Sequence, residues 1–318
     1  MTMASNPGYD RSPHRSVLYH EIISALNPKS PGRYIDATVG AGGHAWGILE
    51  VSSPDGKLLG LDLDPQALAI ASQRLSVYGD RAVLVQASYT TLDVQLRRLG
   101  WEPVQGILLD LGVSSMQLDN SNRGFSFKTD GLLDMRFNPD QPTTAADLVN
   151  QLSEEALADL IWRYGEDRQS RRIARAIVQA RPLQTTLQLA EVIRHAAGAH
   201  RERIDPATRT FQALRIAVNR ELDSVEEVLP KAVQALAPGG RLAVIAFHSL
   251  EDRIVKQFFR RESKDCICPP EQITCTCGHR AAIKEISRHP WMASEEEIAE
   301  NPRARSARLR VVEKIELA

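Results

Sequence analysis

The chain has 318 residues, of which 43% are apolar and 25% charged, and its formal net charge is −1. Such a chain can bury one large core or two smaller ones, so one domain with an insertion is as compatible with it as two domains in series. The near-zero charge excludes a protein that is basic throughout, so a nucleic-acid partner would need a local basic patch. No apolar run approaches the roughly 18 residues of a membrane span, and the first dozen residues are polar without an apolar run. We therefore expect a soluble, cytoplasmic protein without a membrane partner; the sequence leaves the oligomeric state open, and a homodimer is compatible with it.

Short apolar runs that alternate with helical segments predict a parallel sheet with helices on its faces. The predicted strands of the first half are residues 33–38, 56–62, 81–86 and 105–110. The predicted helices are residues 44–51 and 64–78. Asp64 is a good N-cap for the second of them, and Pro65 suits a first helical turn because its missing N–H has no partner there anyway.

The alternation stops after the fourth strand. Between residues 113 and 219 no segment has a convincing strand pattern, and helical spacing covers 147–164, 167–180 and 186–197. The sheet pattern then resumes with a long helix at 208–236, a strand at 241–247, a helix at 250–261 and alternating segments at 282–287 and 307–315 that could form a closing hairpin. The predicted fold class is α/β: a Rossmann-like sheet formed by residues 1–115 and 217–318, with an inserted helical domain at residues 116–216.

A glycine cluster follows the first strand and opens a helix. Gly40, Gly42 and Gly43 are followed by His44, and such a turn lets a nucleotide-like ligand lie against bare backbone. Taken alone, the cluster is also explained as a tight turn that needs positive φ. Asp62 ends the second strand 22 residues after Gly40, where a carboxylate can accept both hydroxyls of a ribose. Together these residues predict a nucleoside cofactor.

Two further carboxylates favour S-adenosylmethionine over NAD. Asp36, inside the first strand, can face the cationic amino-acid end of that cofactor but would be poorly placed beside a pyrophosphate; a paired surface carboxylate is its ordinary explanation. Asp110 ends the fourth strand, and ligands of open α/β sheets bind at the carboxyl ends of the strands. Tyr89, just past the third strand, could stack on an adenine or simply pack in the core.

With these residues in hand, the chain resembles the ribosomal RNA small subunit methyltransferase H family, whose members methylate N4 of a cytosine in 16S rRNA. The resemblance implies a Rossmann-like class I methyltransferase fold, S-adenosylmethionine as the cofactor, and 16S rRNA or the small ribosomal subunit as the partner. The matching segments occur in the same order along nearly the whole chain: His14–Leu18, Asp36–His44, Leu61–Gln66, Gly106–Ser115, Arg123–Phe127, Leu133–Arg136, Pro206–Ala213, Phe247–Arg253 and Glu300–Ser306. By resemblance, the cofactor contacts are Gly42, Gly43, His44, Asp62, Tyr89, Asp110 and Gln117.

An arginine-rich stretch predicts the surface that binds the substrate. Residues 163–220 contain twelve arginines and no lysine against five acids, a local excess of +7. Such an excess suits a phosphate backbone, and the guanidinium group also stacks on unstacked RNA bases. Arg171, Arg172 and Arg175 are the predicted substrate contacts, while pairing with acids on a solvated surface explains at most five of the twelve.

The acceptor chemistry predicts two catalytic candidates. An exocyclic amine attacks a methyl group better when a nearby carboxylate accepts its proton, and Asp110 is placed for that role. Related amino-methyltransferases carry two prolines and an aromatic residue after their acidic or amide residue, whereas this chain has Leu111-Gly112-Val113. His248, at the end of the fifth strand, is the second candidate, and a capping role for it is about equally plausible. An NAD-dependent oxidoreductase and a non-catalytic RNA-binding module remain as alternative functions.

All four cysteines lie within twelve residues: Cys266, Cys268, Cys275 and Cys277. This clustering is unlike the disulfide framework of a secreted protein. Four thiolates can close a tetrahedral zinc site, although the C-x-C spacing is tighter than the C-x-x-C of zinc knuckles. Metal binding, free thiols and paired thiols therefore all stay open, and the resemblance implies no role for this loop.

Overall fold

The computed structural model describes residues 16–198, 205–272 and 274–316 of the chain. Two compact units make up the protein: residues 1–112 with 222–318, and residues 113–221. The predicted domain boundaries, after residues 115 and 216, lie three and five residues from the boundaries of these units. No helix in the described parts is long and apolar enough to cross a membrane.

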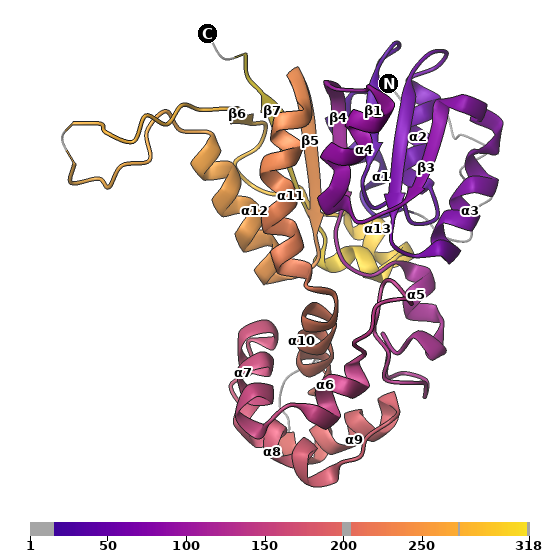
Figure 1. Ribbon diagram of the computed structural model, residues 1–318, viewed down its shortest axis with the longest axis vertical. Helices are drawn as coiled ribbons and strands as arrows, with labels where there is room; N and C mark the ends of the chain where they lie inside the picture. The colour runs from indigo at the N-terminus through magenta and orange to yellow at the C-terminus, as the bar shows by residue number, and fades with distance from the viewer. Residues whose placement is uncertain (1–15, 199–204, 273, 317–318) are drawn as a thin grey trace. The chain divides into compact units, whose positions relative to one another are not determined.

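The first unit is built on a seven-stranded sheet in the order β3-β2-β1-β4-β5-β7-β6 (Figure 1). Its strands are β1 Arg33–Asp36, β2 Lys57–Asp62, β3 Ala82–Gln86, β4 Val104–Asp110, β5 Leu236–Ala246, β6 Ile283–Glu285 and β7 Arg308–Lys314. The first five are parallel, whereas β7 runs antiparallel to β5 and β6 antiparallel to β7. The parallel strands thus have the doubly wound order, which confirms the predicted Rossmann-like α/β fold.

Helices cover both faces of this sheet. They are α1 Tyr19–Leu26, α2 Gly43–Val51, α3 Pro65–Leu75, α4 Leu92–Leu99, α11 Glu221–Ala235, α12 Ser249–Glu262 and the short α13 Glu295–Glu300. Apolar residues of α1, α2 and α3 pack on one face of the strands, and those of α4, α11 and α12 pack on the other. Both faces of the sheet are therefore buried, which explains why the central strands are nearly continuous apolar runs. The sequence analysis did not predict α1, α4 or α13.

The second unit is helical in its described part, as predicted. Its helices are α5 Ser115–Asp119, α6 Ala145–Gln151, α7 Glu154–Gly165, α8 Ser170–Ala180, α9 Thr186–Ala197 and α10 Ala207–Asn219. They enclose a core of their own, to which Phe125, Ile161, Ile177 and Phe211 contribute. An independent core is the mark of a unit that buries enough apolar surface to be compact by itself.

Two predicted helices are each interrupted in the structure. The helix predicted at 147–164 is two helices, because Ser153 caps α7 by accepting a hydrogen bond from the amide of Ala156. The helix predicted at 208–236 breaks at Arg220, which has a left-handed backbone with φ 51° and ψ 41°. Asn219 holds this break, since its Nδ2 donates to the carbonyls of Met135 and Arg215.

Candidate active site

Three carboxylates end neighbouring strands in the middle of the sheet: Asp36 on β1, Asp62 on β2 and Asp110 on β4. β1 lies between β2 and β4. The chain continues from β1 to β2 and β3 on one side of it, and then crosses to β4 and β5 on the other side. This is the topological switch point of the sheet, where open α/β folds bind their ligands. The acidic residues selected from the sequence are therefore brought to one edge of the first unit.

The glycine turn connects β1 to α2 with two left-handed residues. Gly40 has φ 51° and Gly42 has φ 78°, and the amide of Gly42 donates to the carbonyl of Val39 over 2.7 Å. Side chains rarely adopt this conformation, so glycine is needed at both positions for the turn itself. At Gly43, a Cβ would lie 2.1 Å from Oγ of Ser16, which means that the protein fills the space beside this residue.

The carboxylate of Asp62 also stabilises this glycine turn. One carboxylate oxygen accepts the amide of Gly40 and the other accepts the amide of Asp64, each over 2.9 Å. Burial raises the pKa of Asp62, while these two amides lower it. Each carboxylate oxygen has a second lone pair for a ligand hydroxyl. Removing the carboxylate would thus disturb the turn as well as any ribose contact.

Asp36 is 1% exposed, and its Oδ1 accepts the amide of Thr38 over 3.3 Å. Burial raises the pKa of this carboxyl to about 7; His44 and the Thr38 amide oppose the rise, and Asp110 and Asp62 add to it. A cation bound beside Asp36 would favour the charged form of the carboxyl and pull this pKa down. The structure therefore holds a carboxyl whose charge responds to a cationic ligand near neutral pH.

His44 and Asp110 face each other across the switch point. Nε2 of His44 lies 3.6 Å from Oδ2 of Asp110, just beyond hydrogen-bond distance. Within the described residues, both ring nitrogens of His44 and Oδ1 of Asp110 are buried without a hydrogen-bond partner. Unpaired buried polar atoms are costly, so this group fits a site completed by a polar ligand.

Two further residues are cofactor contacts by resemblance. Tyr89 begins a 3-10 turn after β3 and packs against the core under α4 and α11. Gln117 lies on α5 of the second unit, and its Oε1 accepts the amide of Ser114 over 2.9 Å in a capping box. The side chain of Gln117 thus has a structural role in the geometry described here.

His248 is the N-cap of α12. Its Nδ1 accepts the amide of Glu251 over 3.4 Å, and Oε2 of Glu251 accepts the amides of Phe247 and His248 in return. Nε2 of His248 also lies 3.2 Å from Oε1 of Glu251. The capping role weighed in the sequence analysis is therefore present at Nδ1. Nε2 of His248 is buried without a hydrogen-bond partner among the described residues, so its catalytic role stays a prediction.

A cavity of about 320 Å³ adjoins the end of β5. It is lined by Phe247, His248, Ser249, Met292, Arg305, Ser306 and Arg308. Arg308 is held by Asp252 over 3.1 Å, while no ion pair of Arg305 is found in the described part of the chain. The sequence analysis quoted the Glu300–Ser306 segment for its resemblance but assigned no role to Arg305. The missed signal was a second arginine, besides Arg308, beside the end of β5.

Several arginines of the arginine-rich stretch are engaged within the second unit. Arg194 and Arg215 each pair with an acid over 2.8 Å, and Arg181 donates to carbonyls of Val149 and Leu152. Arg175 pairs with Glu154 over 3.1 Å, and this acid lies outside the stretch that was counted. The ion pairs of Arg175, Arg194 and Arg215 stay within the at most five that the sequence predicted, but one of the acids, Glu154, was not among those counted.

Three exposed arginines remain near the start of α8. Arg168, Arg171 and Arg172 are exposed, and no ion pair is found for them among the described residues. Arg201 and Arg203 of the same stretch lie outside the described residues. The predicted substrate contacts therefore differ in kind: Arg171 and Arg172 point their charge to solvent, whereas Arg175 is part of an ion pair.

The fold and the switch-point cluster define a Rossmann-like protein with a site for a polar, cationic nucleoside ligand. The chain matches the MraW methylase family over residues 11–315, and it belongs to that family. The methyltransferase class predicted by resemblance is confirmed, and the oxidoreductase and the non-catalytic module are set aside.

Two relatives of this chain share one name. A "Ribosomal RNA small subunit methyltransferase H" from Dehalococcoides mccartyi is 52% identical over 95% of this chain and 87% of its own length. Another, from Geobacter sulfurreducens, is 52% identical over 95% of this chain and 99% of its own. An rRNA methylase structure from Streptococcus thermophilus is 13% identical with a TM-score of 0.42, covering 94% of each chain, and nothing is inferred from so weak a likeness.

Proposed function

We propose that this protein transfers a methyl group from S-adenosylmethionine to N4 of a cytosine in 16S rRNA, at position 1402. The observation that carries the proposal is the 52% identity to relatives described as small-subunit rRNA methyltransferases, over 95% of the chain. The cytoplasmic location expected from the sequence is part of this proposal. Its direct test is the identity of the methylated nucleoside.

The residues of the switch point fit a cationic nucleoside cofactor. Asp36 offers a buried carboxylate to the cationic amino-acid end, and Asp62 offers oxygens to the ribose. Gly42 and Gly43 belong to this proposed set by resemblance, and the unpaired nitrogens of His44 can complete hydrogen bonds to the ligand. Tyr89 and Gln117 belong to this proposed set by resemblance. S-adenosylmethionine supplies an electrophilic methyl group when bound, so the protein itself needs to align the acceptor and accept its proton.

Asp110 is the proposed proton acceptor. The lone pair of a cytosine amine is delocalised into the ring, and attack leaves a positive charge on nitrogen unless a proton departs. An unpaired carboxylate oxygen at the end of β4 can accept a hydrogen bond from the amine and then its proton. Methylation at C5 would require a cysteine that attacks the ring. The four cysteines all lie in residues 266–277, on the segment that extends away from β1 and β4 in Figure 1, which favours an amine acceptor.

The proposed RNA contacts are exposed arginines. Arg171 and Arg172 supply two positive charges at the surface of the second unit, and Arg305 supplies one beside the cavity of the first. Guanidinium groups bind phosphate in a bidentate manner, so these side chains suit an RNA backbone.

Replacing Arg171 and Arg172 with alanine should weaken RNA binding and flatten its dependence on salt. The slope of log affinity against log salt should fall by about 1.4 to 1.8, because each lost phosphate contact removes about 0.7 to 0.9. Cofactor affinity should stay unchanged. Binding of a 16S rRNA fragment at several salt concentrations measures the slope.

Arg175→Ala is the matched control. This arginine lies on the same helix but is paired with Glu154, so its loss should change the slope by less than either exposed arginine. A double variant with the wild-type affinity and slope would place the RNA surface elsewhere on the protein.

A further inference from the structure

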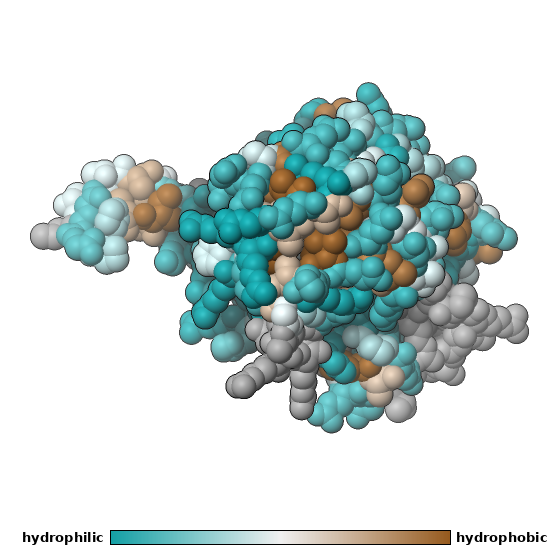
Figure 2. All heavy atoms as spheres, turned by 90° about the horizontal axis from the view of Figure 1, so that it is seen from below, coloured by the Kyte–Doolittle hydropathy of each residue, from teal (hydrophilic) through white to brown (hydrophobic). Residues whose placement is uncertain are grey.

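The four cysteines lie on an arm between α12 and β6, formed by residues 263–282. Figure 2 shows that the arm stands out into solvent, with hydrophilic residues beside a small hydrophobic patch. Its base is fastened to the first unit, because the amide of Ala282 donates to the carbonyl of Glu262 over 2.9 Å and a ring nitrogen of His279 lies 3.2 Å from the carbonyl of Arg261. Among the described residues of the arm, no hydrophobic core supports its outer part, so something else has to hold it.

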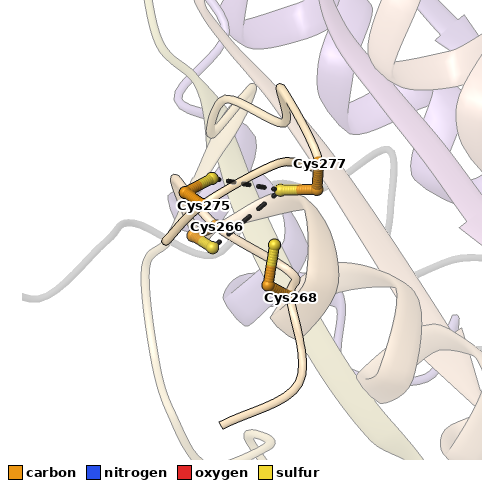
Figure 3. Close-up of side chains that lie close together, drawn as sticks. All are labelled: Cys266, Cys268, Cys275 and Cys277. Atoms are coloured by element: carbon orange, nitrogen blue, oxygen red, sulfur yellow. Dashed lines mark hydrogen bonds between the residues drawn. The ribbon is translucent and has the colours of Figure 1, made fainter. Parts of the chain in front are cut away.

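Within the arm, the four thiols converge from two short segments. Cys266 and Cys268 precede the outer turn, and Cys275 and Cys277 follow it, with all four sulfur atoms within 4.8 Å of one another (Figure 3). Sγ of Cys277 lies 3.6 Å from that of Cys275 and 3.9 Å from that of Cys266. The tight C-x-C spacing thus does not prevent the four sulfurs from meeting at one point.

These separations match a tetrahedral metal site. Four sulfurs at about 2.3 Å from a zinc ion are about 3.8 Å from each other. A disulfide would need two sulfurs at about 2.05 Å, roughly half the distances found. Three of the four cysteines are exposed, and free thiols in solvent have no reason to gather in this way.

Backbone amides also point at one of the sulfurs. The amides of Ile267 and His279 both donate to Sγ of Cys277, each over 3.5 Å. Two N–H donors stabilise a negatively charged sulfur, which is the form that binds metal. These two amides are therefore placed to stabilise a thiolate, as is expected at a metal site whose four sulfur ligands carry excess negative charge.

We propose that Cys266, Cys268, Cys275 and Cys277 bind one zinc ion that holds the arm together. Four protein ligands fill a tetrahedral shell and leave no position for water or substrate, so the site is structural rather than catalytic. Zinc replaces the missing apolar core of the arm, since metal binding contributes directly to the folding of such small segments.

The full chain, purified without chelator, should contain one zinc per chain by elemental analysis. Cys268→Ser and Cys275→Ser should each lose the metal, whereas Thr274→Ala, inside the same turn, should retain it. Replacement of zinc by cobalt should give the absorption spectrum of a tetrahedral tetrathiolate site. Removal of zinc should also speed cleavage by trypsin after Lys264 and Arg280, and added zinc should restore the slow rate.

Several outcomes would overturn the zinc site. One is a metal content well below one per chain even after loading with Zn²⁺ and desalting. Others are iron instead of zinc, zinc retained in both serine variants, or disulfides found in the intact chain by a mass lower by two hydrogens for each bond. None of these readouts depends on methyl transfer, so failure here leaves the proposed activity untouched.

Discussion

Asp110→Asn should slow methyl transfer to 16S rRNA by about 10²- to 10⁴-fold, the usual contribution of a positioned proton acceptor. Asparagine keeps the shape of the side chain but cannot accept the proton of the amine. The orphaned Oδ1 and the neighbouring His44, 3.6 Å from Oδ2, make this carboxylate a partner for ligands rather than for the protein. Single-turnover rates at saturating cofactor and RNA measure the effect.

Asp80→Asn provides the control for this substitution, since it removes an exposed carboxylate of the same unit. Its single-turnover rate should equal that of the wild type. Calorimetry on Asp110→Asn should show a smaller loss in cofactor affinity than in rate, because most of the effect arises during the reaction. A rate within a few-fold of the wild type would remove Asp110 from the chemistry.

Binding of S-adenosylmethionine should strengthen by about tenfold between about pH 6 and about pH 8, and Asp36→Asn should abolish this gain. The pKa of Asp36 is raised to about 7 by burial, so the carboxyl is mostly neutral below that pH and charged above it. The cofactor is a cation and favours the charged form. The folding stability of the protein without cofactor depends on pH with the opposite sign. Because the pKa of Asp36 is raised in the folded state, this carboxyl contributes stability at low pH, and that contribution is lost as the pH rises through about 7.

Calorimetry at several pH values, with the wild type and Asp36→Asn in parallel, separates this carboxyl from the amino group of the cofactor. The amino group titrates in both proteins, so the difference between the two curves belongs to Asp36. Equal pH dependence of the two proteins would show that Asp36 does not face the cation.

Strand ends and their acids were predictable from the sequence because they follow local rules. Asp36, Asp62 and Asp110 each end a short apolar run, and parallel strands bring such ends to one edge of the sheet. The glycines between β1 and α2 were predictable for the same reason, since positive φ is demanded locally. The resemblance added His44 on α2, whose proposed role depends on Asp110, 3.6 Å away at the end of β4.

Features decided by distant contacts could not be found this way. The break at Arg220 lacks a glycine or proline and is held by Asn219 through the carbonyl of Met135, far along the chain. The pairing of Arg175 with Glu154 joins two helices. By contrast, the start of α7, which the sequence analysis missed, carries a local signal, because Ser153 followed by two glutamates is a common helix N-terminus.

The measurement that tests the central proposal most directly is the identity of the methylated nucleoside. Small ribosomal subunits from cells that lack this enzyme would be incubated with the purified protein and labelled S-adenosylmethionine, and the digested rRNA analysed by mass spectrometry. We expect N4-methylcytosine as the main product, formed by the wild type and strongly reduced with Asp110→Asn. 5-Methylcytosine or a methylated adenine as the main product, or no transfer to rRNA at all, would contradict the account.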